Sequence, residues 1–194
     1  MVPVDFSKHS EYALEVASKI AKQHEMGIVI LHMLRVSESV LSKLEEEERQ
    51  EIKYYLKLAK EKINKFTAKD CLKEVSVGAI VQNYKLFEEV SEVAQEQNCG
   101  LIVMGSHGTS GLSDFFVGSN TEKVVRSSGV PVLVIKKHHE DYTVKKMIFA
   151  CDLNPENVSA YKKALAFATL YGASLEIIYV NTAAVNYMGY SDFD

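Results

Sequence analysis

The sequence predicts an α/β fold built on a doubly wound parallel sheet of five strands. Over residues 1–137, short continuous apolar runs alternate with stretches whose apolar residues recur at helical spacing. Apolar runs of this kind are typical of strands that crossover helices bury on both faces. Because such crossovers are right-handed, few topologies remain, and the doubly wound sheet is the simplest of them.

The individual elements follow from these two periodicities. A long helix, for instance, is indicated by five apolar residues on one stripe, at spacings of four and three: Ile52, Leu56, Ala59, Ile63 and Phe66. In a doubly wound sheet, ligands bind beyond the carboxyl ends of the strands, where the strand order reverses. Strands are expected at residues 2–5, 28–34, 72–77, 101–104 and 130–135, and helices at residues 7–25, 37–68, 86–97 and 119–127.

Composition restricts which partners and which cellular compartment we expect for this protein. The chain has 47% hydrophobic and 25% charged residues and a net charge of −4, which is typical of globular proteins and not of nucleic-acid or membrane-surface binders. Its longest apolar runs are too short to span a bilayer. The three cysteines are scattered, without metal-binding spacing, which favours a reducing, cytoplasmic compartment.

A glycine-rich stretch between the fourth predicted strand and the next helix is the most informative segment. Gly105, Gly108, Gly111 and Gly118 lie in it, and glycines allow a backbone to approach a ligand closely. The helix that follows, expected to open at Ser119, offers free N–H groups and the positive end of its dipole. The segment therefore predicts a phosphate site; the alternative is that the glycines only form turns.

The same helix start also matches a capping box. The pattern S-x-x-E over Ser119 and Glu122 predicts that the serine side chain caps the helix. Capping and phosphate binding are compatible roles. Ser106 and His107 are adjacent, but no acid is evident to orient them, so no catalytic residue is expected.

At these residues the chain resembles the universal stress proteins that bind ATP. The pattern G-x2-G-x9-G-[S/T] is matched in full by Gly105, Gly108, Gly118 and Ser119, and VPVDFSKHSEYAL near the start and PVLVIK near residue 137 are also similar to the family. The resemblance implies an adenine nucleotide α-hydrolase-like, Rossmann-like sheet of strand order 3-2-1-4-5. It also implies ATP as the ligand, with Mg²⁺ or Mn²⁺ as the accompanying ion.

The resemblance also implies a set of binding residues. Asp5 would end the first strand, where a carboxylate can accept from ribose hydroxyls or the adenine amine; pairing with the helix N-terminus is the alternative. Thr109 stands where the family often has a basic residue, which predicts weaker triphosphate binding or a greater need for a divalent ion. The implied adenine and ribose contacts are Pro3, Val4, Asp5, Met33 and Met104, and the implied phosphate contacts are Gly105, Gly108, Gly118, Ser119 and Asn120.

The pattern restarts after a polar stretch. Laid on the start of the chain at an offset of 147 residues, Asp152 falls on Asp5 and Asn154 on Ser7, which are both good helix N-caps. The alternative is that any two strand–helix–strand units look alike. We expect a first domain at 1–137, a solvated linker at 138–144 that includes His138 and His139, and a partial second copy at 145–194, with both ends cut relative to a longer tandem protein.

Three functions from different classes are compatible with these residues. The leading hypothesis is a stress-response regulatory module that ATP switches between conformations or partners, with slow or no hydrolysis. The alternatives are an enzyme that forms an adenylate and a dimerisation scaffold without nucleotide. The uncharged run Val130–Ile135 would lie at the sheet margin, which predicts a homodimer or a swapped assembly through that strand.

Overall fold

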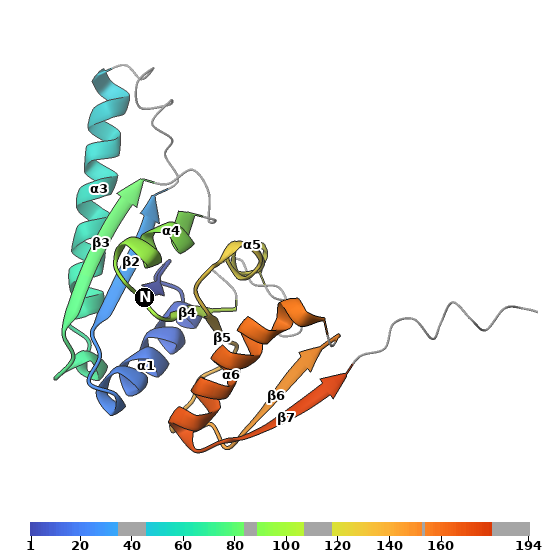
Figure 1. Ribbon diagram of the computed structural model, residues 1–194. Coiled ribbons are helices and arrows are strands. Elements are labelled where there is room, and N and C mark those ends of the chain that lie inside the picture. The colour runs from blue at the N-terminus through green and yellow to red at the C-terminus, as the bar shows by residue number, and fades with distance from the viewer. Residues whose placement is uncertain (35–45, 84–88, 107–117, 153, 180–194) are drawn as a thin grey trace, which may run out of the picture. The chain divides into compact units, whose positions relative to one another are not determined.

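The chain divides into two compact units, Met1–Glu140 and Asp141–Asp194. The computed structural model describes residues 1–34, 46–83, 89–106, 118–152 and 154–179 (Figure 1). None of the helices in these ranges combines the length and the apolar character that a membrane crossing requires.

The first unit contains five parallel strands. They are β1 (Val2–Pro3), β2 (Ile28–Leu34), β3 (Val77–Asn83), β4 (Ile102–Gly105) and β5 (Val132–Ile135). The ladders run in the order β1-β2-β3 and, separately, β4-β5. The expected α/β fold with parallel strands is confirmed, whereas a single five-stranded sheet of order 3-2-1-4-5 is not resolved.

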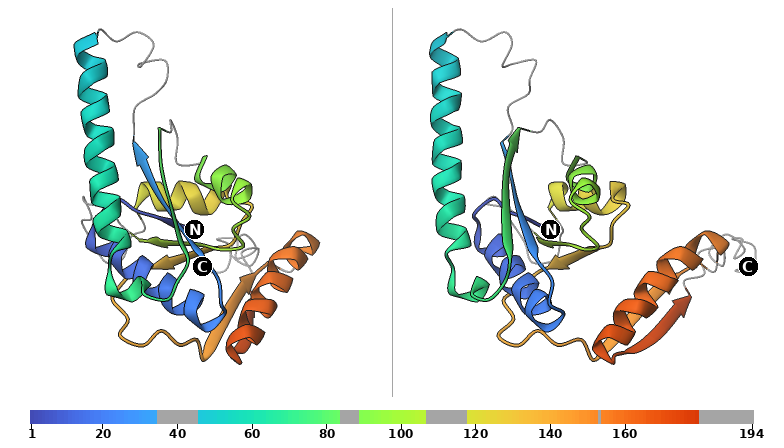
Figure 2. Two further views of the ribbon diagram at one scale, coloured as in Figure 1. Left: turned by 90° about the vertical axis from the view of Figure 1, so that its left-hand side faces the viewer. Right: turned by 60° about the vertical axis from the view of Figure 1, so that its left-hand side comes forward.

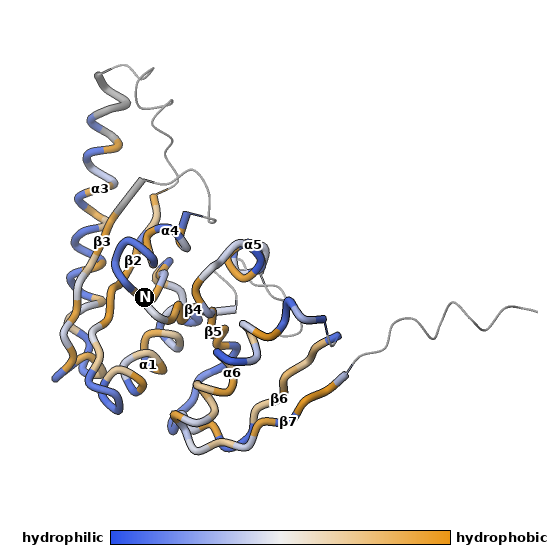
Figure 3. Tube along the Cα trace, viewed as in Figure 1, coloured by the Kyte–Doolittle hydropathy of each residue, from blue (hydrophilic) through white to orange (hydrophobic). Residues whose placement is uncertain are grey.

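Helices cover these strands on both faces (Figure 2). Helices α1 (Lys8–Gln23) and α3 (Glu46–Thr67) lie on one side, and α4 (Glu89–Glu96) and α5 (Ser119–Ser127) lie on the other. Apolar residues recur along β2 and α1 (Figure 3), and many of them are buried. On the α4 and α5 side, the buried core consists of Met1, Leu31, Val90, Val93, Ala94, Ile102, Met104 and Val124.

Several predicted boundaries require correction. The strand expected at residues 72–77 is wrong, because Asp70–Leu72 forms a 3-10 turn and β3 begins only at Val77. The alternating pattern there arises from Leu72, which is buried in the turn, and Glu74 adopts a left-handed φ of 69° that no strand residue would have. Residues 35–45 and 84–88, parts of two expected helices, lie outside the described residues.

The first helix begins as its sequence predicts. The Ser7 side chain caps α1 by accepting from the Ser10 N–H at 3.3 Å. Ala13, Ala17 and Ala21, which recur every four residues, are all buried. Their small side chains allow the helix axis to lie close to the strands beneath it.

The polar stretch after β5 contacts α1, although His138 and Glu140 remain exposed as expected for a solvated segment. The His138 side chain lies 3.1 Å from the Glu15 carboxylate. Lys19 donates to the His139 carbonyl at 2.7 Å and also to the carbonyl of Glu140. These contacts hold the end of the first unit along its first helix.

Two elements of the first unit approach each other closely at Gly105, the last residue of β4. A Cβ atom added there would lie 2.7 Å from the carbonyl carbon and oxygen of His9 and 2.8 Å from its Cβ. These distances are shorter than real side-chain contacts, and two of the atoms belong to the backbone of α1. Gly105 is therefore required for packing whether or not it touches a ligand.

The second unit is one strand–helix–strand motif. It comprises β6 (Lys146–Cys151), a 3-10 turn (Pro155–Asn157), α6 (Val158–Tyr171) and β7 (Ser174–Tyr179). The Asn154 side chain caps the turn by accepting from Glu156 N at 3.2 Å, and Gly172 ends α6 in the left-handed conformation. Ile148, Ile177 and Ile178 are exposed by 58%, 55% and 44%, so this unit leaves much of its apolar surface uncovered.

We predict that Gly105→Ala lowers the free energy of unfolding of the nucleotide-free protein by about 1–3 kcal/mol, because the methyl group must displace the α1 backbone. Gly100→Ala is the matched control, since an added Cβ there meets no atom within 4 Å; it should change stability by no more than about 0.5 kcal/mol. Urea unfolding of the three proteins measures both effects. Equal midpoints for the two variants would contradict the packing argument.

Candidate functional site

The end of β4 is the point where three elements of the predicted site meet. The start of α1 lies against Gly105, as the short distances to His9 show. The first turn of α5 is joined to the same residue, because the Thr121 hydroxyl donates to the Gly105 carbonyl at 3.0 Å. Asp5 and Ser119, which are far apart in sequence, therefore lie on segments that converge on one strand end.

The glycine-rich segment is closed at its base by a backbone hydrogen bond. The N–H of Gly118 donates to the carbonyl of Ser106 at 2.7 Å, and the N–H of Ser106 donates to the Ile135 carbonyl at 2.9 Å. Both ends of the segment are thereby anchored to the end of the β4–β5 ladder. Gly108, the remaining glycine of the predicted pattern, lies outside the described residues.

The predicted capping box at α5 is wrong. The N-cap is Gly118, one residue earlier than expected, and no side chain among the described residues caps it. Glu122 instead forms an ion pair with Arg126 at 2.9 Å. The cap glycine has φ of −60°, so its glycine identity is not needed for a left-handed backbone. The first turn, with Ser119 exposed and Asn120 half-buried, therefore has no side-chain cap at Gly118.

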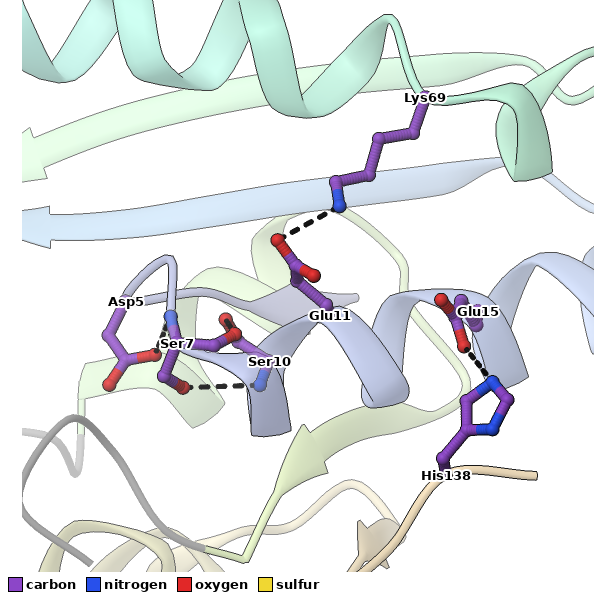
Figure 4. Close-up of polar contacts among 7 residues, drawn as sticks. All are labelled: Asp5, Ser7, Ser10, Glu11, Glu15, Lys69 and His138. Carbon is purple, nitrogen blue, oxygen red and sulfur yellow. Dashed lines mark hydrogen bonds and ion pairs between the residues drawn. The ribbon is translucent and has the colours of Figure 1, made fainter.

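Asp5 lies in the turn between β1 and α1, beside the helix N-terminus. Its side chain is exposed, and one carboxylate oxygen accepts from the Ser7 N–H at 3.0 Å (Figure 4). The alternative interpretation of Asp5, as a partner of the helix start, is thus part of its role. The bond also fixes the direction in which the carboxylate points.

The remaining predicted contacts differ in their exposure. Pro3 is half-buried in β1, paired with Leu31, and Val4 is 6% exposed and continues the ladder through its N–H. Met104 is 6% exposed within the core, and Met33 packs against that core. These four residues lie at or near the carboxyl ends of β1, β2 and β4, while Asp5 and the start of α5 supply polar groups beside them.

Two residues next to Asp5 were not predicted as part of the site. The Nδ1 atom of His32, on β2, lies 2.8 Å from the Val4 carbonyl oxygen, and its ring lies 4.5 Å from the ring of Phe6. Burial lowers the pKa of His32, with the Val4 carbonyl and Asp5 opposing the effect. The sequence signal for His32 was that it is the single polar residue within the apolar run Ile28–Leu34. Nothing in the sequence indicated that Phe6 adopts a left-handed φ of 64°.

Comparisons with known proteins agree with this architecture. Residues 1–136 match the model of the universal stress protein family. Universal stress protein MJ0577 of Methanocaldococcus jannaschii is 32% identical over 155 residues, which cover 71% of this chain and 93% of the relative. Universal stress protein YxiE of Bacillus subtilis is 31% identical over 150 residues, 70% of this chain and 97% of the relative.

Solved structures support the same assignment. The structure of MJ0577 has a TM-score of 0.55 and 28% identity and covers 72% of this chain and 95% of its own. Protein PA1789 of Pseudomonas aeruginosa, at 19% identity and a TM-score of 0.58, covers 93% of this chain and 59% of its own, so its similarity in fold extends past the first unit. The fold, the family match and these relatives together show that the chain belongs to the universal stress protein family.

Proposed function

We propose that the first unit binds an adenine nucleotide, ATP, and acts as a regulatory module with slow or no hydrolysis. The observation that carries the proposal is the convergence near Gly105 of the start of α1, which follows the Asp5 turn, the anchored glycine segment and the start of α5, which no side chain of the described residues caps. A helix start of this kind binds phosphate through its N–H groups and dipole. Asp5 would accept from the nucleoside.

Backbone groups and side chains have different roles in the proposed site. The N–H groups at the start of α5, over Ser119 and Asn120, would bind phosphate oxygens, and Gly118 would let the phosphates approach. Pro3, Val4, Met33 and Met104 would form the floor under the base. Gly105 and Gly108 complete the proposed set. Since no lysine is placed in the segment, Mg²⁺ or Mn²⁺ would neutralise the triphosphate charge.

We also propose that the two ladders form one sheet of order 3-2-1-4-5. Met1 supports this order, because its carbonyl accepts from Val103 N at 2.9 Å and its amine donates to the Leu101 carbonyl at 2.7 Å. These bonds lie on the side of β1 opposite to β2. The strand order then reverses between β1 and β4, which is where Asp5 and Gly105 lie.

The second unit is, in our proposal, a partial second copy of the domain, with 138–144 as the connection. The support is the strand register, which repeats at the offset of 147 residues. Val2 pairs with Ile30 in β1–β2, and Phe149 pairs with Ile177 in β6–β7. Two unrelated strand–helix–strand units would show the same register only if the spacing of their strands and the length of their helices happened to agree.

Side-chain contacts repeat at the same offset. Asp5 accepts from Ser7 N at 3.0 Å, and Asp152 accepts from Asn154 N at 3.0 Å. Equivalent chemistry at equivalent positions supports duplication more strongly than a shared strand–helix–strand pattern does. The second copy has no equivalent of the glycine segment within residues 145–194, so the proposed nucleotide site belongs to the first unit alone.

Millimolar Mg-ATP should raise the melting temperature of the chain. A ligand that binds only the native state stabilises it by about 2.7 kcal/mol at a hundredfold excess over Kd, which corresponds to roughly 5–10 °C. Differential scanning calorimetry measures the shift. Gly118→Val is the control variant: its φ of −60° suits a valine, so the fold should persist while the side chain blocks the phosphates. An unmoved wild-type transition would refute the proposed function.

Replacing Asp5 tests the nucleoside contact. Asp5→Ala should weaken Mg-ATP binding by about 1.5–3 kcal/mol, or about 10- to 150-fold in Kd, because a hydrogen bond to a charged acceptor is lost. Asp5→Asn is the matched variant, since its amide oxygen can still accept from Ser7 N and preserve the turn. Isothermal titration calorimetry compares the three proteins, and unchanged affinity in both variants would place the nucleotide elsewhere.

The chain is also proposed to associate through β5, within Val130–Ile135. The Pro131 and Ile135 carbonyls accept from Ile102 and Ser106, so the backbone groups of the alternate residues Val132 and Val134 face the other side of the strand. In the described ladders β5 pairs only with β4. An uncharged outer strand of this kind is a template for pairing with another copy.

Light scattering at micromolar concentration should therefore give the mass of a dimer. Val134→Pro removes an outward N–H that β4 does not use, a change that edge strands tolerate, and should shift the protein to monomer. The melting temperature of the variant checks that it is folded. A monomeric wild-type protein would show that this edge is not the interface.

A further inference from the structure

The turn that carries Asp5 is held in a conformation that its own residues disfavour. Phe6 has φ of 64°, in the left-handed region, which is an outlier for a bulky side chain. Such a conformation is unfavourable for a residue with a Cβ atom and persists only where surrounding contacts enforce it. Phe6 follows Asp5 directly in the sequence. The contacts that hold Phe6 therefore also determine where the Asp5 carboxylate lies.

The Phe6 ring is enclosed by aromatic groups from two other elements. The imidazole of His32, on β2, lies 4.5 Å away at an interplanar angle of 41°, and the ring of Phe66, on α3, lies 5.6 Å away, nearly perpendicular at 78°. The ammonium group of Lys62 lies 5.7 Å from the Phe6 centroid. Edge and tilted contacts of this kind favour one position of the ring.

His32 also holds the residue on the other side of Asp5. Its Nδ1 lies 2.8 Å from the carbonyl oxygen of Val4. A carbonyl only accepts, so Nδ1 carries the proton of this bond. Burial is the main cause that lowers the pKa of His32, which favours the neutral ring. Thus one side chain contacts both sequence neighbours of Asp5. The charged groups that act on it are Asp5 and Lys62, with opposite effects on its pKa.

We propose that His32 is a positioning residue of the nucleotide site: by binding the Val4 carbonyl and packing on the Phe6 ring, it fixes the Asp5 carboxylate for the nucleoside. This inference rests on the proposed function. It assigns His32 no contact with the ligand. Its effect on affinity is exerted through Asp5, and it must disappear when the carboxylate is removed.

A double-mutant cycle tests this dependence. His32→Leu, which removes both the hydrogen bond and the ring, should weaken Mg-ATP binding about tenfold, a part of the loss expected for the carboxylate itself. In the Asp5→Ala background the same change should weaken binding no further, because residues that act as a unit are not additive. His32→Asn should recover part of the affinity, since its amide N–H can replace Nδ1–H. Isothermal titration calorimetry gives the four affinities of the cycle and that of the rescue variant.

The outcomes separate the two proposals. If the wild-type chain fails to bind Mg-ATP, the proposed function fails, and this inference fails with it. If the wild-type protein binds but His32→Leu has no effect, or weakens binding equally with and without the Asp5 carboxylate, the positioning role alone is overturned. Melting temperatures of the nucleotide-free variants show whether each is folded; should His32→Leu unfold, the cycle is carried out with His32→Phe, which keeps a ring but not the hydrogen bond.

Discussion

The close approach of β4 to the N-terminal turn of α1 is the constraint on which the rest of the first unit depends. At Gly105 the strand lies so near His9 that no side chain fits between them. This approach allows a residue of the first turn of α5, Thr121, to bond to the same strand end. It therefore brings two helix starts and the end of a parallel strand into one region. A larger residue at this position would separate the groups that form the proposed site.

The polar groups at this strand end are held in place by hydrogen bonds and ring packing. Asp5 is oriented by the Ser7 N–H, and the turn around it is held by the packing of Phe6 against His32. The glycine segment is fixed at its base by the Gly118–Ser106 bond. Preorganisation of this kind lowers the entropic cost of binding a ligand, because the receptor groups are ordered before the ligand arrives. The long helix α3 contributes Phe66 and Lys62 to the surroundings of Phe6.

Residues at matching positions of the two units differ in how deeply they are buried. Leu31 is buried in the first unit, whereas Ile178, at the matching position in register, is 44% exposed. Leu31 packs on α4, β4 and α5, whereas the described residues of the second unit contain no equivalent of these elements. The local structure formed by caps and apolar spacing is thus similar in both units, but burial comes from the elements that close the core.

The sequence by itself determined the alternation of parallel strands and helices, the Ser7 and Asn154 caps and the start of α5, because periodicity and capping depend on neighbours within a few residues. It also identified the glycine segment as a predicted phosphate site, for which the resemblance implied ATP as the ligand. Only the tertiary structure decided that Gly118 and not Ser119 caps α5, that Gly105 serves packing, and that His32 supports the Asp5 turn. The Gly105 and His32 features arise from contacts with His9 and Val4, which are far away in the sequence. Local propensity carries no information about such contacts, and the distances between packed elements decide them.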